Sequence, residues 1–239
     1  MNTLTVLNKE LRSYFGSPFA YIIMAAFLVL GGILFAGAAT DPNGPQAASM
    51  DGFFSPLPVL LLLIAPILSM RLLADEQRSG TLELLLTAPV GDGAVVVGKY
   101  LASFLLYLAM LALSLVFGLL LSFFGNPAWG VILSSYLGAA LVGAACLAIG
   151  LFASSLSANQ AVAAFIALTI TLVLWLAERV ALFVDNPNIR SFISQMALFT
   201  HYGSFTQGVI NTKDVFYYLS ITVVFVFMAV QSLQSRRWR

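Results

Sequence analysis

The sequence predicts an all-α polytopic membrane protein with six transmembrane helices. Of its 239 residues, 60% are hydrophobic and only 9% are charged, and a soluble domain of this length could not bury so much apolar surface. Six stretches have the length of about 20 apolar residues that crossing a bilayer requires. Most of the charged residues lie between these stretches or at their ends, where they can stay in water.

The six spans belong to a single domain, residues 1–239, because the sequence shows no internal repeat and no low-complexity linker. The predicted spans are residues 19–39, 53–73, 99–124, 131–153, 161–184 and 215–233. The second span contains Pro56, Pro58 and Pro66. Proline removes a backbone donor, so we expect this span to be kinked or broken near its start.

Residues 1–16 precede the first span and have the pattern of an amphipathic interfacial helix. The apolar side chains that recur on one face are Leu4, Leu7, Leu11 and Phe15. The alternative is a signal peptide cleaved near Ala36-Gly37-Ala38. The apolar run that follows is longer than the about 7–15 residues of a signal-peptide core, which favours the interfacial helix.

The distribution of lysine and arginine predicts that both termini are cytoplasmic. If six spans alternate, one side of the membrane receives Lys9, Arg12, Arg71, Arg78, Lys99, Arg236, Arg237 and Arg239. The opposite side receives Arg190 and Lys213, with Arg179 near a span end.

Residues 71–89, between the second and third spans, form the most charged segment. Its charged residues are Arg71, Asp75, Glu76, Arg78 and Glu83. We expect two short helical pieces, 72–78 and 82–87, separated at Gly80. Thr81 can cap the second piece, and Pro89 ends it.

The second piece would carry an apolar strip, because Leu82, Leu85 and Leu86 share one helical face. Sequence physics leaves two interpretations of this strip open. It either lies on lipid headgroups or fills a groove on a soluble partner protein.

Several chemistries are excluded by composition. Cys146 and His201 are the only residues of their types, so disulfides within the chain, cysteine metal centres and His-pair metal sites are absent. Residues 93–99 fit GxxxxGK, but Tyr100 replaces the hydroxyl residue that binds magnesium, and no nucleotide site is predicted. Lys99 is interpreted as a snorkelling membrane anchor. We expect no metal, no bound cofactor, no Ser-His-Asp set and, at a net charge of +1, no nucleic-acid binding.

Small residues recur along the fourth span, which predicts close helix packing within one chain or between two. They are Ala139, Gly143, Cys146 and Gly150. Glu178 and Arg179, near the outer end of the fifth span, serve either as interface anchors or in gating.

Residues 185–214 form the longest loop and lie outside. They are too apolar for a flexible linker, and we expect two short helices joined near Tyr202-Gly203. His201 in this loop is interpreted as a solvated or hydrogen-bonded side chain.

Several motifs resemble ABC-2-type permeases, the membrane subunits of ABC exporters, and in particular the gliding-motility-associated branch and its neighbour from nitrous-oxide-reductase maturation. The segment 71–89 contains Glu76-x-x-x-Gly80-Thr81-Leu82-Glu83-x-Leu85. Further matches are Lys9-Glu10-Leu11-x-x-Tyr14-Phe15-x-Ser17-Pro18, Gly98-Lys99-Tyr100-Leu101-Ala102, residues 149–156, His201-Tyr202-x-x-Phe205-x-x-Gly208 and Val215-x-Tyr217-x-Leu219-Ser220.

The resemblance implies a non-catalytic permease in a bacterial inner membrane, with re-entrant helices between spans five and six. It implies a second permease chain, identical or related, and two copies of a separate ATPase that holds ATP and magnesium. An accessory membrane or extracytoplasmic protein is a further partner that the resemblance allows. The residues expected to couple to that ATPase are Asp75, Glu76, Arg78, Gly80, Thr81, Leu82, Glu83 and Leu85. Export by alternating access is the function that this resemblance implies. A membrane scaffold that moves no solute, or an ion-coupled secondary transporter, are the alternatives.

Overall fold

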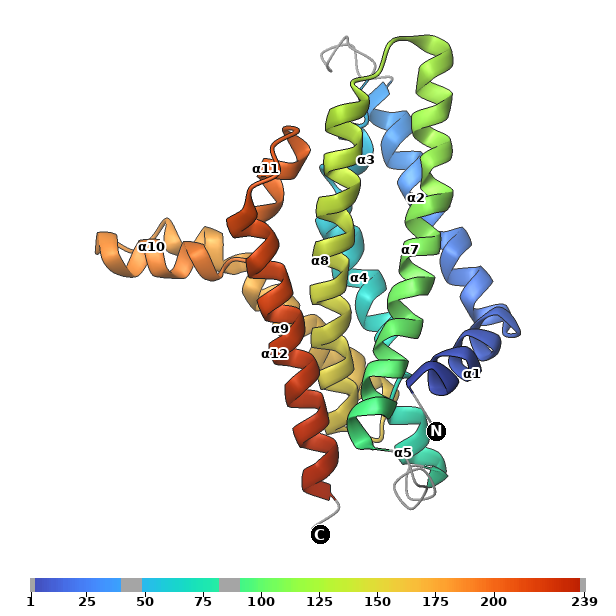
Figure 1. The fold of residues 1–239 in the computed structure, drawn as a ribbon. Coiled ribbons are helices and arrows are strands. Elements are labelled where there is room, and N and C mark those ends of the chain that lie inside the picture. Colours follow the sequence, from blue (N-terminus) through green and yellow to red (C-terminus); the bar gives the residue numbers. More distant parts are fainter. Residues whose placement is uncertain (1–2, 40–48, 82–90, 237–239) are drawn as a thin grey trace.

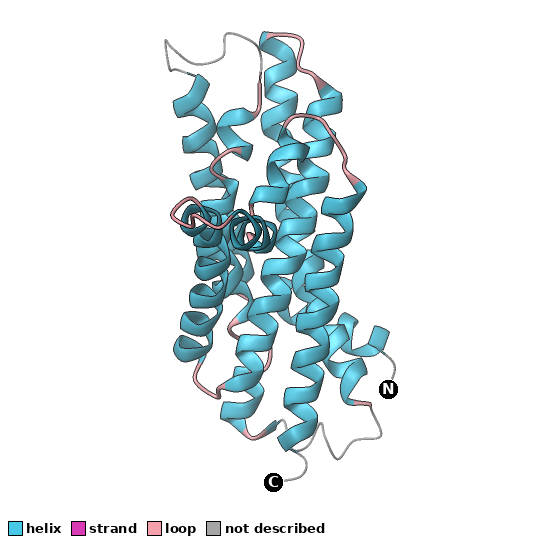
Figure 2. Cartoon of the chain, turned by 90° about the vertical axis from the view of Figure 1, so that its left-hand side faces the viewer, coloured by secondary structure: helices cyan, strands magenta, loops and turns pink. Residues whose placement is uncertain are grey.

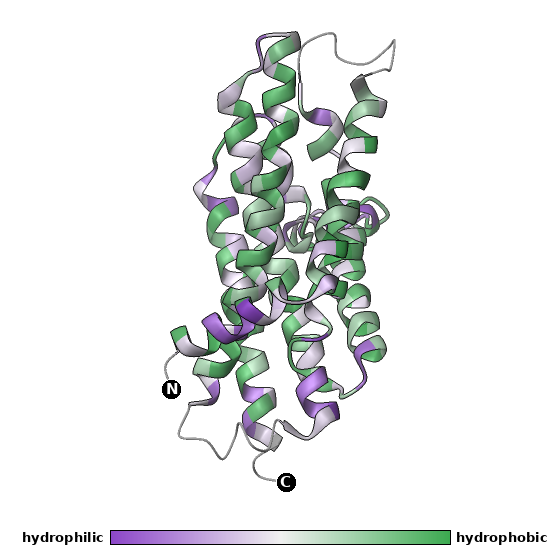
Figure 3. Cartoon of the chain, turned by 90° about the vertical axis from the view of Figure 1, so that its right-hand side faces the viewer, coloured by the Kyte–Doolittle hydropathy of each residue, from purple (hydrophilic) through white to green (hydrophobic). Residues whose placement is uncertain are grey.

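The computed structural model describes residues 3–39, 49–81 and 91–236, and these residues form helices and loops without any strand (Figures 1 and 2). Six helical segments within them are long and apolar enough to cross a membrane. They are α2 (Pro18–Ala39), α4 (Leu57–Ser69) with its continuation, α7 (Asp92–Phe124), α8 (Trp129–Leu156), α9 (Gln160–Ala181) and α12 (Thr212–Arg236). The predicted fold class is therefore confirmed. Figure 3 shows mostly apolar residues along these helices and hydrophilic residues on α1 and near helix ends.

Helix α8 is the centre of the bundle, because α4, α7, α9 and α12 all pack against it. In its most apolar stretch 78% of the residues are buried, compared with 17% in α9 and 11% in α12. The outer helices expose apolar side chains such as Phe165 and Val223. In a membrane-spanning chain such apolar side chains face lipid, so their exposure on the outer helices does not destabilise the fold.

The small residues of α8 allow neighbouring helices of the same chain to approach. A Cβ atom at Gly143 would collide with the ring of Tyr107 on α7, and one at Gly150 would collide with Ser69 on α4. The Tyr107 hydroxyl donates a hydrogen bond to the Ala139 carbonyl over 2.9 Å. Cys146 is buried among these contacts, so the stripe packs within one chain.

The second span is broken, as its prolines predict. A short helix, α3 (Asp51–Phe54), is followed by an interruption at Ser55-Pro56 before α4 begins. At its other end α4 stops at Ser69, and a turn leads into the short helix α5 (Ala74–Ser79). The break between α4 and α5 places α5 at the end of the bundle, beyond the apolar helices (Figure 1).

Helix α1 (Thr3–Phe15) lies across the bundle and packs mainly against α7. Gly98 of α7 makes this approach possible, since a Cβ atom there would stand 2.9 Å from the Cβ of Val6. Val6 is buried, whereas Leu4 and Phe15 are exposed. A tight turn at Gly16-Ser17 then leads into α2, so α1 meets the first span at an angle (Figure 1).

The segment between α9 and α12 contains α10 (Pro187–Met196), the 3-10 turn η1 (Thr200–Tyr202) and α11 (Gly203–Thr206). The predicted joint at Tyr202-Gly203 is wrong, because η1 continues directly into α11. The two short helical pieces are separated instead at residues 197–199. Helix α10 projects sideways from the bundle (Figure 1) and has no buried residue.

Candidate functional site

The charged segment after α4 is folded as the short helix α5, which carries Asp75, Glu76 and Arg78. The first predicted helical piece is thus present, at Ala74–Ser79 instead of 72–78. Thr81 lies just beyond its end. The predicted docking residues Leu82, Glu83 and Leu85, like Leu86, fall outside the described residues.

Gly80 ends α5 in the left-handed conformation, with φ of +71°. Glycine adopts this conformation without the steric cost that a Cβ imposes, so a helix commonly ends at such a residue. The Ser79 hydroxyl forms hydrogen bonds on both sides of Gly80. It donates to the Asp75 carbonyl over 2.8 Å and lies 2.8 Å from the Thr81 hydroxyl. The chain therefore leaves α5 in a defined direction at Gly80.

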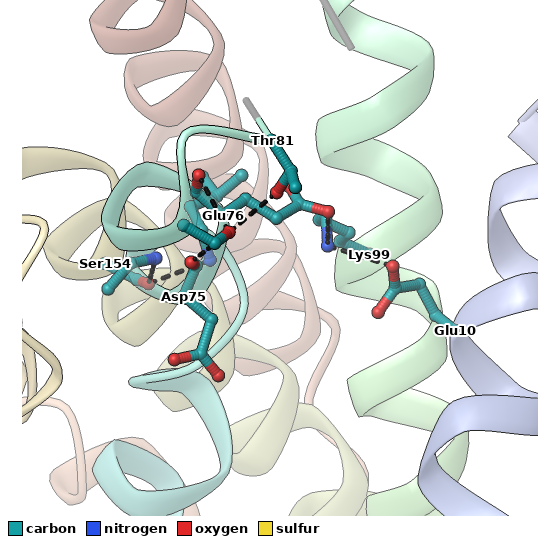
Figure 4. Close-up of polar contacts among 9 residues, drawn as sticks. Glu10, Asp75, Glu76, Thr81, Lys99 and Ser154 are labelled. Carbon is teal, nitrogen blue, oxygen red and sulfur yellow. Dashed lines mark hydrogen bonds and ion pairs between the residues drawn. The ribbon is translucent and has the colours of Figure 1, made fainter. Parts of the chain in front are cut away.

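The beginning of α5 is capped by a side chain from another helix. Leu73 precedes α5 and has no side-chain oxygen with which to satisfy the first amide donors of the helix. The buried Ser154 hydroxyl of α8 accepts hydrogen bonds from the Leu73 and Ala74 amides, each over 3.0 Å (Figure 4). The same hydroxyl donates to the Met70 carbonyl over 3.1 Å. One serine thus holds both sides of the turn between α4 and α5.

Two glutamines extend this attachment to the turn between α8 and α9. The Gln77 side-chain amide donates to the backbone carbonyls of Ser154 and Ser155, over 3.3 and 3.1 Å. The Gln160 amide, in the first turn of α9, donates to the Asp75 carboxylate. Helix α5 is therefore fastened to α8 and α9 along its length.

Lys99 of α7 fastens α5 on its other side. Its ammonium lies 2.9 Å from a carboxylate oxygen of Glu76 on α5 and 2.9 Å from one of Glu10 on α1 (Figure 4). The interpretation of Lys99 as a snorkelling anchor is wrong, because the residue is only 3% exposed. A buried lysine needs such partners, since an unpaired charge would be costly there.

Arg71 lies at the end of α4, beside this network, and its guanidinium stacks on the Phe19 ring of α2 at 3.9 Å. This is a cation–π contact. Its Nε atom is buried without a hydrogen-bond partner among the described residues. Arg71 thus retains donors that the rest of the described chain does not use.

The remaining candidates lie in the last turns of α9 and in the segment between α9 and α12. Glu178 and Arg179 are exposed in the last turns of α9, and the described residues offer neither of them an ion-pair partner. Anchoring at a membrane boundary stays a prediction for both residues. Gating by these residues stays an open alternative.

His201 is held in a polar cluster that sequence reasoning missed. Its Nδ1 lies 2.7 Å from the Asp214 carboxylate, which also accepts a hydrogen bond from the Ser204 hydroxyl over 2.6 Å. The other ring nitrogen lies 3.1 Å from the Gln195 carbonyl, and the ring stacks on Tyr217.

Although this cluster combines Ser, His and Asp, it is not a hydrolytic triad. The serine and the histidine both bond to the carboxylate, so no base faces the serine hydroxyl. The cluster joins α11 to the start of α12 and is structural. Within the three described ranges, no group of three or more His, Cys, Asp or Glu side chains could hold a metal ion.

A comparison with protein families identifies the family of this chain. Residues 4–236 match the family described as ABC-2 family transporter protein, which is nearly the whole chain, and the protein belongs to that family. It is therefore a multi-pass membrane permease component of an ABC transporter, a class of subunit that works with a separate ABC ATPase. The comparison with curated proteins gave no significant match.

Proposed function

We propose that the chain is the permease subunit of an exporter, and that α5 with residues 80–85 receives the motion of the ATPase on the cytoplasmic side. The observation that carries this proposal is the attachment of α5. Hydrogen bonds and an ion pair connect this one short helix directly to α7, α8 and α9, and Lys99 of α7 in turn connects it to α1. A helix attached in this way can pass a displacement to several spans at once.

The charged residues of α5 fit a docking role better than a lipid-facing one. Arg78 is exposed at the end of α5, and α5 lies at one end of the bundle (Figure 1). In this proposal the leucines at 82 and 85 fill a groove on the ATPase, while Arg78 and Glu83 pair with charges around that groove. ATP and magnesium bind to the ATPase alone.

We further propose that two permease chains and two ATPases form the working transporter, and that the pathway opens between the permease chains by alternating access. The sideways projection of α10 supports a second chain. Its polar side chains, such as Arg190 and Gln195, and its apolar ones, such as Phe192, are uncovered. A second permease chain against α9 and α10 would cover both kinds of side chain.

The docking proposal is tested by co-purification of the ATPase with the full-length permease. Leu82→Asp should abolish co-purification, because a carboxylate cannot enter an apolar groove. Leu84→Asp is the matched control, since residue 84 falls on the opposite face of a helix that presents Leu82 and Leu85. Equal retention of the ATPase by both variants would overturn the docking role. Both variants must reach the membrane in wild-type amounts.

Transport is tested separately with reconstituted vesicles. The wild-type complex should accumulate or expel a tracer in an ATP-dependent manner, and Leu82→Asp should remove this activity. A complex that hydrolyses ATP and moves no solute of any tested class would favour a scaffold.

A further inference from the structure

A cleft of about 280 Å³ lies between α1, the start of α2 and α5. Its lining combines three cations with three carboxylates: Lys9, Arg71 and Lys99 with Glu10, Asp75 and Glu76. The charges therefore balance, although they are not equally available. This difference in availability determines what the cleft can bind.

Each carboxylate of the cleft already has one partner within the described chain, although the second carboxylate oxygen of Glu76 is buried there without a hydrogen bond. Lys99 bridges Glu10 and Glu76, and the Gln160 amide donates to Asp75. Arg71 and Lys9, in contrast, have no carboxylate within ion-pair distance among the described residues. The unused capacity of the cleft is therefore a guanidinium and an ammonium, which favour a phosphate group, and one oxygen of Glu76, which favours a cation.

Neutral donors surround the same cleft. Ser13, Tyr14 and Ser17 line it beside Arg71. Burial raises the pKa of the Tyr14 phenol well above its ordinary value, and the nearby Glu10 carboxylate acts in the same direction. The phenol therefore stays protonated and serves as a donor.

The position of the cleft indicates the source of the phosphate. Phe19 lines it in the first turn of one membrane helix, and Arg71 lines it just after another, α4, has ended. Lipid headgroups lie at this boundary between hydrocarbon and water. Ile22 is 65% exposed and follows Phe19 by three residues on the same helical face, so acyl chains could run along α2.

We propose that this cleft binds the phosphate-bearing headgroup of a membrane phospholipid, with Arg71 as its principal ligand. Because the lining charges balance, a zwitterionic headgroup such as phosphoethanolamine fits the site, with its phosphate on Arg71 and its ammonium toward the unpartnered oxygen of Glu76. A bound headgroup would contact α1, α2 and α5 together. The site is independent of the docking proposal, since it requires only that α2 and α4 cross the membrane.

The test uses the full-length chain in maltoside micelles, titrated with phosphatidylethanolamine and observed by native mass spectrometry. We expect one tightly bound lipid in the wild type. Diacylglycerol, which lacks the phosphate, should not bind, and inorganic phosphate should not displace the lipid. Displacement by inorganic phosphate would assign the site to a free anion and overturn the lipid proposal.

Variants locate the binding site. Arg71→Gln should weaken lipid binding at least about 10-fold, the size expected for loss of a hydrogen bond between charged groups. Arg12→Gln is the matched control, because Arg12 is an exposed cation of α1 that does not line this cleft, and it should bind as the wild type does. Ser13→Trp changes an exposed residue and should block the cleft without altering its charge.

The remaining outcomes overturn the proposal. Equal lipid binding by Arg71→Gln and wild type would do so, as would an equal loss in Arg12→Gln, which would mean unspecific surface attraction. If Arg71→Gln fails to fold, undiminished binding by Ser13→Trp would exclude the cleft. If Arg71→Gln keeps the lipid and instead loses the ATPase, the guanidinium serves an acidic group of that partner.

Discussion

The Ser154 hydroxyl of α8 lies 3.0 Å from the backbone amide of Leu73, which precedes it by 81 residues in the chain. A side chain from the most buried membrane helix therefore caps a helix that stands outside the apolar bundle. The geometry of α5 depends on this distant residue as well as on its own sequence.

Replacing Ser154 with alanine should free α5. The Leu73 and Ala74 amides would lose their acceptor in a buried place, at a cost of about 2 kcal/mol in the free energy of unfolding. Co-purification of the ATPase should also fall. Thermal unfolding in detergent measures the first effect. Ser103→Ala is the control, since that hydroxyl is equally buried but bonds within its own helix, to the Tyr100 carbonyl. A Ser154→Ala variant no less stable than Ser103→Ala would contradict the capping role.

Replacing Lys99 with methionine should leave two partly buried carboxylates facing one another without a cation. Breaking a buried ion pair from one side costs about 3 kcal/mol. Glu10→Gln and Glu76→Gln introduced together with Lys99→Met should recover most of the lost stability, because no charge is then stranded. The measurement compares the free energy of unfolding of the single variant, the triple variant and the wild type. A single variant as stable as the wild type would show that the ion pairs contribute nothing.

Replacing Gly143 with alanine should push α8 away from α7, because the added Cβ collides with the Tyr107 ring. We expect a loss of about 2 kcal/mol from overpacking. Gly130→Ala, in the same helix, is the control, since nothing lies within 4 Å of a Cβ at that position. Alanine is the better helix former, so this control should be neutral or slightly stabilising. Comparable destabilisation by both changes would refute the packing account.

The orientation of the chain is tested with single cysteines. Thr5 of α1 and Lys213 of α12 are exposed, and the distribution of lysine and arginine predicts that they lie on opposite sides of the membrane. Buried Cys146 can be replaced by alanine to remove the background thiol. In intact cells, a membrane-impermeant maleimide should label Lys213→Cys and should reach Thr5→Cys only after the membrane is opened. The reverse pattern would place α5 outside, and the ATPase could not then reach it.

The fold was largely predictable, because run length and hydropathy report directly on membrane spans. The proline cluster also predicted the break at Pro56, since a missing backbone donor has a local consequence. The joint within the loop before α12 was misplaced, because nothing in its local sequence distinguishes η1 from a linker.

The attachments of α5 could not be predicted in the same way. Ser154 is one of many serines in an apolar chain, and its partners are backbone amides that only the fold brings near. Lys99 looked like an anchor because its position at the start of an apolar run is typical of one. Its pairing with Glu10 and Glu76 depends on how α1 and α5 approach α7. The spacing of apolar residues along the sequence does not show this approach. The role of residues 82–85 in docking stays a prediction.

The double attachment of α5 restricts how the helix can move. A force applied at Gly80 is resisted by the hydrogen bonds to Ser154 on one side of α5 and by the ion pair with Lys99 on the other. Helix α5 therefore cannot rotate freely about its turn with α4. It must either carry α1, α7 and α8 with it or break a hydrogen bond or an ion pair. Small movements would therefore be shared among several spans, and only large ones would separate them.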